Sequence, residues 1–398
     1  MTHSQYRAHD WLTREIERIL EFYHPACVDD AHGGFVAQLD PDTGEIYDPD
    51  SKHLVATARF TVNFAVASRL GGPEWALSMA ESGVDFLSEH HYDPQHRGYD
   101  WILNGTQTVE GTRVAYGHAF VLLAYARATE AGVDAADTHL EETYQLLMSR
   151  FWEPEHTLYK SEFSRDWSQS APYRGQNANM HACEAMLAAY EATDRDPYLT
   201  RAREIGHTIA VDLAEETGGL IWEHYTENWE HDFEYNRDEP EDKFRPWGYQ
   251  PGHHIEWAKL LAVLDRYTDE QWPLDRAETL FEEAVNYGWD TDRGGFYYTF
   301  DREGRPLIKD KYRWPVAEGI GAVAALYERT GREKYLNWYD RLWKYAEDCL
   351  IAPGRNWYLR LSSDNERYEN EGGVEVEPGY HPIGACFEAL RSFADESR

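Results

Sequence analysis

Residues 174–191 read RGQNANMHACEAMLAAYE, and this segment predicts a helix with a polar stripe. Asn177 and His181 are four residues apart and Glu184 follows three residues later, so all three lie on one helical face. The neighbouring face is apolar, so both faces are expected to be buried. Buried amide, imidazole and carboxyl groups need hydrogen-bond partners or a polar cavity. The stripe is therefore either a hydrogen-bonded cluster in the core or part of a binding site.

A short turn followed by an aromatic residue or leucine recurs at intervals of 60 to 76 residues. The six copies are HGGF at 32–35, RGY at 97–99, HTLY at 156–159, TGGL at 217–220, RGGF at 293–296 and GRNWY at 354–358. We expect each copy to close a short hairpin. The intervals between them usually hold two helical patterns, such as 114–132 with 139–151.

This regular spacing is typical of repeated supersecondary units. Six helix pairs can form an open solenoid or close into a ring. An open solenoid needs polar terminal caps, which the sequence does not suggest, so closure is favoured. The sequence predicts an all-α fold, an (α/α)6 barrel with short β-hairpins in the loops between units. Because no Pro-, Gly- or Ser-rich linker interrupts the chain, residues 1–398 are expected to form a single catalytic domain.

Composition excludes several classes of partner. The net charge of −34 argues against nucleic acid and anionic membranes. The four cysteines contain no C-x-x-C pair, which indicates free thiols in a reducing compartment. The N-terminus has no apolar signal core, and no apolar run approaches the length of a membrane span. A cytoplasmic protein is expected, and the sequence leaves open whether it is a monomer or a homo-oligomer.

Polar residues recur with the same period near the start of one predicted helix in each unit. They are Arg59, His118, Asn177 with His181, His253 with Glu256, Glu318, and His381. The inner helices of a closed ring all begin at one end, so these side chains would meet at one funnel mouth. Any one of these residues is explained equally well as a helix cap or a surface group. Polar residues that recur with the same period in six units indicate a shared pocket.

The residue types in this pocket suit a small neutral ligand such as a sugar, because aromatic walls would surround a few polar groups. His253 lies in the first helical turn, where the helix dipole disfavours a charged imidazole, so it is expected to act as a neutral base. No metal is expected, because the sequence has no H-E-x-x-H and the adjacent His253 and His254 point apart on a helix. Phosphate-binding and dinucleotide-binding glycine motifs are also missing from the sequence, so no cofactor is expected.

Four segments resemble the N-acylglucosamine 2-epimerase superfamily, and within it the mannose isomerase and sulfoquinovose isomerase branch. They are RGQNANMHACEA at 174–185, PGHHIEWAKLL at 251–261, RWPVAEGIGA at 313–322 and GYHPIGACFEAL at 379–390. The resemblance extends from about residue 59 to residue 390. It implies an (α/α)6 barrel and metal-free aldose–ketose isomerisation through a cis-enediolate, with His253 and His381 as the acid/base pair.

The same resemblance implies the residues that contact the sugar. They are Arg59, Tyr116, Asn177, His181, Glu256 and, at the base of the pocket, Glu318. Tyr116 is assigned from its YGH context alone. His118 matches no residue of known role in the family and is expected to support the pocket from behind.

Two positions depart from the sulfoquinovose isomerase pattern. Lys243 stands where that branch has an arginine, and Glu377 stands where it has a glutamine. Glu377 would repel a sulfonate, and lysine lacks the planar fork with which arginine binds such oxyanions. The expected substrate is therefore D-mannose, interconverted with D-fructose, or a related neutral aldose such as D-lyxose.

Three other functions remain open from the sequence. A sugar 2-epimerase would use the same residues but return the proton to the other face of C2. A glycoside hydrolase on an (α/α)6 barrel would need two carboxylates beside the glycosidic bond, and Glu256 with Glu318 could fill those roles. A non-catalytic sugar-binding protein would not need two histidines at proton-transfer positions.

Overall fold

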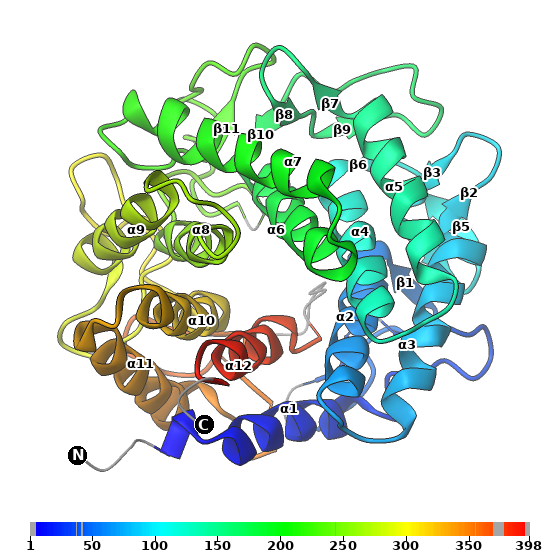
Figure 1. The fold of residues 1–398 in the computed structure, drawn as a ribbon, viewed down its shortest axis with the longest axis horizontal. Helices are drawn as coiled ribbons and strands as arrows, with labels where there is room; N and C mark the ends of the chain where they lie inside the picture. Colours follow the sequence, from blue (N-terminus) through cyan, green and yellow to red (C-terminus); the bar gives the residue numbers. More distant parts are fainter. Residues whose placement is uncertain are drawn as a thin grey trace.

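The computed structural model describes residues 5–36, 38–40, 43–242, 244–354, 356–368 and 378–394. These residues form twelve α-helices in two concentric rings (Figure 1). The inner ring comprises α2 (Leu54–Arg69), α4 (Ala115–Glu130), α6 (Gln176–Thr193), α8 (Pro251–Leu264), α10 (Arg313–Thr330) and α12 (Tyr380–Ser392). The outer ring comprises α1 (His9–Tyr23), α3 (Trp75–Phe86), α5 (Ala136–Arg150), α7 (Asp196–His207), α9 (Trp272–Gly288) and α11 (Glu333–Tyr345). The predicted (α/α)6 barrel is confirmed.

The ring closes by contact between the two ends of the chain. Helix α1 packs against α12, and α12 also contacts α2, so the last inner helix adjoins the first (Figure 1). The other helix pairs follow chain order, with α2 packed on α3, α4 on α5, α6 on α7, α8 on α9 and α10 on α11. The first outer helix, α1, therefore packs against the last inner helix, α12.

Burial explains which helices form the inner ring. Every residue of α8 is buried, as expected for a helix surrounded by neighbours on all sides. The outer helix α11 instead buries Tyr335, Tyr339, Leu342 and Trp343, whose spacing of mostly three or four residues defines a single face. Three outer helices end in a π-helical turn: η2 (Leu87–His91) after α3, η3 (Thr208–Leu213) after α7 and η4 (Ala346–Leu350) after α11. None of the described helices is both long and apolar enough to cross a membrane.

Strands are short and lie in the connections between helices. They are β1 (Ser51–His53), β2 (Tyr92–Asp93), β3 (Gly98–Tyr99), β4 (Ile102–Asn104), β5 (Gln107–Glu110), β6 (Arg113–Val114), β7 (Trp152–Glu153), β8 (Leu158–Tyr159), β9 (Glu162–Phe163), β10 (Arg174–Gly175), β11 (His224–Tyr225), β12 (Lys311–Tyr312) and β13 (Arg360–Leu361). Pairing is antiparallel in β1–β4–β5, β2–β3, β6–β9, β7–β8, β10–β11 and β12–β13.

The predicted hairpins are present at five of the six turns. Two contain paired strands, β2 with β3 and β7 with β8, and three are single antiparallel bridges, Val28–Phe35, Trp289–Phe296 and Ile351–Trp357. The sixth turn, at 217–220, differs. Its Gly219 N–H donates to the carbonyl of Ala214, and residues 214–221, all of them described, form no strand pairing.

Buried ion pairs fix the start of four inner helices. In each, a basic residue in the strand just before the helix binds an acidic residue of the preceding hairpin. The pairs are Lys52–Asp29 at 2.7 Å, Arg113–Asp93 at 2.6 Å, Arg174–Glu153 at 2.8 Å and Lys311–Asp290 at 2.7 Å. All four basic side chains are buried. Removing the acidic partner of Lys52, Arg174 or Lys311 would therefore leave a buried cation without its carboxylate, whereas Arg113 also pairs with Asp100 at 2.8 Å. The hairpins therefore hold α2, α4, α6 and α10 in register at one end of the barrel.

Candidate active site

The sequence-predicted residues occupy equivalent places on the inner helices. Counted from the first residue of each helix, they stand at the second, third or sixth position. Arg59 is sixth in α2, Tyr116 second in α4, Asn177 second and His181 sixth in α6, His253 third and Glu256 sixth in α8, Glu318 sixth in α10 and His381 second in α12. Residues three or four apart share a helical face. The contacts described below join these positions across the ring, so the inner helices begin at the same end.

His381 is held by Glu318 of the neighbouring helix. The Nδ1 atom of His381 lies 2.7 Å from Oε1 of Glu318, and both residues are buried. Burial alone would raise the pKa of Glu318, but the charge of Lys259 and the hydrogen bond with His381 hold it below the ordinary value. Glu318 is therefore an anion that accepts the Nδ1 proton of His381. The ring nitrogen that can exchange a proton with a substrate is Nε2.

His253 has a corresponding carboxylate that the sequence did not reveal. Its Nδ1 atom lies 2.8 Å from Oε2 of Glu223, which precedes β11. The Trp257 indole N–H donates to Oε1 of Gln176, at 2.8 Å. Because an indole N–H can only donate, the amide N–H₂ of Gln176 must face Glu223, to which it donates at 2.8 Å. The same amide nitrogen also lies 2.9 Å from Nδ1 of His253. Burial alone would raise the pKa of Glu223, but His253 and the hydrogen bonds from His253 and Gln176 hold it below the ordinary value, so Glu223 is an anion that can accept the Nδ1 proton of His253.

Trp314 packs against both histidines. Its ring centroid lies 5.1 Å from that of His253 and 6.0 Å from that of His381. A side chain at Gly252 would collide with the Trp314 ring, because a Cβ there would lie 2.2 Å from the nearest ring atom. Glycine before His253 is therefore required to let the indole approach. The two imidazoles thus lie next to one shared aromatic ring.

Arg59 approaches from the opposite side of the ring. Its guanidinium lies 4.4 Å from the centre of the Phe120 ring and 4.9 Å from that of Tyr380, and its Nη2 donates to the Tyr116 hydroxyl at 3.1 Å. The Tyr116 ring packs edge-on against His181 at 5.1 Å. Aromatic faces stabilise this buried cation. Arg59, Tyr116 and His181 therefore form one cluster.

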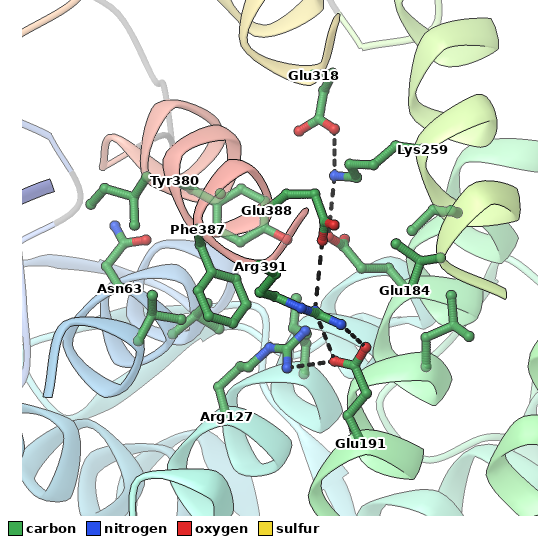
Figure 2. A pocket seen from close by; sticks show the side chains of 18 residues that line it. Asn63, Arg127, Glu184, Glu191, Lys259, Glu318, Tyr380, Phe387, Glu388 and Arg391 are labelled. Carbon is green, nitrogen blue, oxygen red and sulfur yellow. Dashed lines mark hydrogen bonds and ion pairs between the residues drawn. The ribbon is translucent and has the colours of Figure 1, made fainter. Parts of the chain in front are cut away.

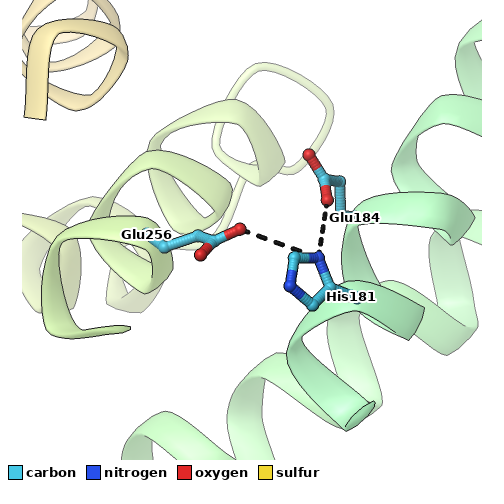
Figure 3. A group of neighbouring side chains, drawn as sticks. All are labelled: His181, Glu184 and Glu256. Atoms are coloured by element: carbon cyan, nitrogen blue, oxygen red, sulfur yellow. Dashed lines mark hydrogen bonds and ion pairs between the residues drawn. The ribbon is translucent and has the colours of Figure 1, made fainter. Parts of the chain in front are cut away.

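Figure 3 shows how His181, Glu184 and Glu256 face one another. The Nδ1 atom of His181 lies 3.0 Å from Oε2 of Glu184, and it lies 3.7 Å from Oε1 of Glu256. Burial lowers the pKa of His181 to about 4, so its ring is neutral at physiological pH. Asn177, on the same helix, has a buried Oδ1 atom with no hydrogen-bond partner among the described residues.

Glu256 differs from the other carboxylates of the site. Its side chain is buried and its Oε1 has no hydrogen-bond partner in the described part of the chain. Burial raises the pKa of Glu256 well above its usual value, and the negative charge of Glu318 raises it further. Glu256 is therefore a neutral carboxylic acid that can donate a hydrogen bond into the site.

Two groups of these side chains have metal-ligating atoms within 4.8 Å of one another: His181, Glu184 and Glu256, and Glu256, Glu318 and His381. Within these groups His181 binds Glu184 and His381 binds Glu318. Glu318 also holds the ammonium group of Lys259, a cation that would compete with a metal ion. That the site works without a metal stays a prediction.

His118 binds two backbone groups in the connection before α4. It is the fourth residue of α4, and its Nε2 accepts the backbone N–H of Tyr99 at 3.2 Å while Nδ1 donates to the carbonyl of Val114. Asn179 and His254 occupy the same fourth position in α6 and α8 and accept from Tyr159 and Ile221. These side chains tie the inter-unit loops to the inner helices. That His118 supports the pocket from behind stays a prediction.

Lys243 and Glu377, on which the sequence-based choice of substrate depends, lie outside the described residues. Sequence reasoning missed four residues that contact the predicted ones directly. Glu223, Gln176 and Trp314 contact His253, and Lys259 contacts Glu318. Lys259 lay inside the quoted PGHHIEWAKLL segment, three residues after Glu256. The spacing from Glu256 to Lys259 equals the spacing from His181 to Glu184, and this equality could have pointed to Lys259 as part of the site.

Comparison with known proteins shows the family of this chain. Residues 33–385 match the N-acylglucosamine 2-epimerase (GlcNAc 2-epimerase) family. A D-mannose isomerase of Marinomonas mediterranea is 40% identical over 394 residues, which cover 98% of this chain and 99% of that protein. A crystal structure of a D-mannose isomerase superposes with a TM-score of 0.94 at 39% identity, covering 98% of this chain and 100% of the other. The cellobiose 2-epimerase from Spirochaeta thermophila shares the fold, with a TM-score of 0.85 at 23% identity over 98% and 97% of the two chains. The chain belongs to the N-acylglucosamine 2-epimerase family.

Proposed function

We propose that this protein is an aldose–ketose isomerase that interconverts D-mannose and D-fructose. The observation that carries the proposal is the pair of histidines that both pack against Trp314, each with Nδ1 bound to its own carboxylate. Moving hydrogen from C2 to C1 requires a base beside the carbon atoms and a second proton carrier beside the oxygens. The similarity to D-mannose isomerases over nearly the full chain supports the choice of sugar.

His381 is proposed as the base that removes the C2 proton. With Nδ1 bound to Glu318, Nε2 takes the proton and the imidazolium that forms is stabilised by the adjacent carboxylate. The electron pair of the C2–H bond forms the C1–C2 double bond of a cis-enediolate, and the aldehyde oxygen takes the negative charge. Return of the proton from His381 to C1 gives the ketose.

His253 is proposed to act on the sugar oxygens. It first assists opening of the ring, and it then carries a proton between O1 and O2 as the enediolate forms and collapses. Glu223 orients His253 for these steps through Nδ1. Glu256 lies near His181 and Glu318 instead.

The remaining residues are proposed to bind and orient the sugar. Arg59 and Tyr116 can donate to oxygen atoms, and neutral His181 and Asn177 can both donate and accept. Glu256, as an uncharged acid, can donate to a hydroxyl without repelling the enediolate. No metal or other cofactor is part of the proposal, and the whole chain, 1–398, is proposed to be one catalytic domain.

A neutral aldose such as D-mannose or D-lyxose remains the proposed substrate on the strength of Lys243 and Glu377 in the sequence. The proposed location is the cytoplasm, whose reducing conditions suit the four free cysteines, Cys27, Cys183, Cys349 and Cys386. Glycoside hydrolysis fits the geometry less well. Both oxygens of Glu318 are already engaged, one by His381 and one by Lys259, and neither is placed to serve as a nucleophile.

Incubating the purified protein with a panel of aldoses and ketoses, separated by chromatography, tests the proposal. D-Mannose and D-fructose should interconvert, and D-lyxose should react detectably. Sulfoquinovose should have a much lower kcat/KM than D-mannose. A preference for the sulfonated sugar would overturn the substrate assignment, and release of an aglycone from nitrophenyl glycosides would favour the hydrolase.

A further inference from the structure

A buried lysine lies between two carboxylates, Glu318 and Glu184, each of which binds a histidine of the site. Lys259 is the ninth residue of α8, and its side chain is almost fully buried. Its Nζ donates to Oε2 of Glu318 on one neighbouring helix and lies 3.7 Å from Oε1 of Glu184 on the other (Figure 2). A buried ammonium group is strongly unfavourable unless it is paired. Here it is paired on both sides.

Each of these carboxylates also holds a histidine of the site. Glu318 binds Nδ1 of His381 at 2.7 Å, and Glu184 binds Nδ1 of His181 at 3.0 Å. Lys259 thus stands at the centre of one continuous chain of contacts that crosses four inner helices. In order, its members are His381 on α12, Glu318 on α10, Lys259 on α8, Glu184 and His181 on α6.

The charge of Lys259 decides the protonation of both carboxyl groups. Burial would raise the pKa of Glu184 and of Glu318, but Lys259 is the largest influence that lowers them, and both lie below their ordinary values. Glu256, whose carboxyl group is neutral, lies close to Glu318. Without the ammonium group, two or three carboxyl groups would share a buried region, and like charges there favour protonation.

The protonation of Glu318 in turn sets the tautomer of His381. A carboxylate accepts the Nδ1 proton and leaves Nε2 as the basic nitrogen. A protonated Glu318 would donate to Nδ1 instead, which would place the histidine proton on Nε2, where it could no longer accept a proton from the sugar.

We propose that Lys259 is a positioning residue that keeps Glu318 and Glu184 ionised and thereby fixes His381 and His181 in the tautomer protonated on Nδ1. It does not touch the sugar and acts only through the two carboxylates. The expected effect on turnover rests on the proposed isomerase function, whereas the effect on the histidine tautomers does not.

The surroundings of Lys259 provide a way to test its charge separately from its packing. Lys259 lines a cavity of about 60 Å³, which Leu187 and Arg127 also line. Figure 2 shows Arg127 bound to Glu191 in this cavity. Gly321 leaves room for the lysine stem, because a Cβ there would lie 3.3 Å from its Cδ. Truncating Lys259 would enlarge this cavity enough to admit a small alkylammonium ion.

The experiment compares Lys259→Met, Lys259→Arg and Lys259→Ala with wild type, and uses Arg127→Met as a matched control. Arg127 is buried at the same cavity and is ion-paired, but it contacts neither Glu318 nor Glu184 in the described structure. Lys259→Met should lower kcat for D-mannose by ~10² to ~10⁴, the range expected when a catalytic histidine is left in the wrong tautomer. Its KM should change by less than about threefold, because the sugar contacts stay in place.

Restoring a positive charge should restore activity. Lys259→Arg should keep at least about a tenth of the wild-type kcat, and ethylammonium chloride should raise the kcat of Lys259→Ala by about tenfold or more, whereas sodium chloride should not. Arg127→Met should keep kcat within about threefold of wild type when rates are referred to folded protein. Should Lys259→Met fail to fold, Lys259→Gln, which fills the space with an uncharged amide, decides the same question.

Nitrogen-15 NMR of histidine-labelled protein gives the readout that is independent of turnover. Wild type and Lys259→Arg should show His381 protonated on Nδ1, and Lys259→Met should show the signal of the other tautomer. An unchanged tautomer in Lys259→Met, or a loss of kcat that neither arginine nor ethylammonium restores, would overturn the proposal. A protein that shows the tautomer shift but never converts D-mannose would instead refute the isomerase assignment alone.

Discussion

The Nδ1 atom of His381 lies 2.7 Å from Oε1 of Glu318, and this contact determines which nitrogen of His381 can receive a proton from the sugar. The two residues come from adjacent inner helices, α12 and α10, near the ends at which these helices begin. The pair therefore exists only because the ring brings the starts of its inner helices together. His253 repeats the arrangement with Glu223, at 2.8 Å.

Replacing His381 by asparagine should lower kcat by at least ~10² to ~10⁴, the range typical of a lost general acid or base. The KM for D-mannose should change much less, because Arg59, Tyr116 and Glu256 remain. Steady-state kinetics on folded protein measures both constants. His139→Asn, on the outer helix α5, serves as control and should retain wild-type turnover. Near-normal turnover in His381→Asn would mean that the base is another residue, with His181 the next candidate.

Replacing His253 by asparagine should separate the two proton transfers. If His253 works on the oxygens and His381 on the carbons, His253→Asn should still exchange the C1 proton of D-fructose slowly in D₂O, whereas His381→Asn should not. Glu223→Gln should weaken the same step as His253→Asn, because it removes the anion that orients His253. Proton NMR of the ketose follows the exchange. Equal exchange in the two histidine variants would remove the basis for assigning them different roles.

Acid should destabilise the fold well before the carboxylates titrate. Burial lowers the pKa of five histidines from 6.5 to about 3 or 4: His53, His91, His118, His181 and His254. The unfolded chain binds these protons below pH 6.5 and the native protein does not, so stability is present above that pH and is lost as pH falls. Each histidine contributes up to about 1.4 kcal/mol per pH unit in this window.

Two buried carboxyl groups oppose this trend, because burial raises the pKa of Glu256 and Glu283, and protonation of each then favours the native state. The stability lost through the five histidines exceeds the stability gained through the two carboxyl groups. The free energy of unfolding should therefore fall by roughly several kcal/mol between pH 7 and pH 5. Urea denaturation at pH 7, 6 and 5 measures it. Equal or greater stability at pH 5 would show that these histidines are protonated in the native protein.

Prolonged dialysis against a strong chelator should leave turnover unchanged, because the proposed steps use only imidazole and carboxyl groups. The rate of fructose formation before and after dialysis, with metal content measured by mass spectrometry, gives the comparison. Loss of activity that a divalent ion restores would assign a metal to one of the two groups around Glu256.

The sequence was sufficient for the fold because burial and period are encoded locally. The regular recurrence of turns predicted repeated helix pairs closed into a ring, and every residue of an inner helix such as 251–264 is buried there. The same period located His253, Glu256, Glu318 and His381 near the helix starts. The period could not show that His181 faces the site whereas His118 faces a loop. His118 is fourth in its helix and His181 is sixth in its own, and these positions point about 200° apart although they differ by only two residues.

The parts of the site that escaped prediction depend on contacts between distant segments. Glu223 lies 30 residues before His253 in an inter-unit loop, and nothing local marks it as the partner of that histidine. Lys259 sits in a helix whose other residues are buried, and a lone lysine there has no evident use until Glu184 and Glu318 are placed on either side. These relationships are set by packing across the ring and not by spacing along the chain.

One measurement tests the central claim most directly: an NMR time course of D-mannose with the purified protein in D₂O. The account predicts D-fructose as the first product, carrying deuterium at C1, because a proton held by His381 exchanges with solvent before it is returned. The His381→Asn variant should give neither product nor label. D-Glucose as the first product would identify a 2-epimerase, and unchanged D-mannose would contradict the proposed function.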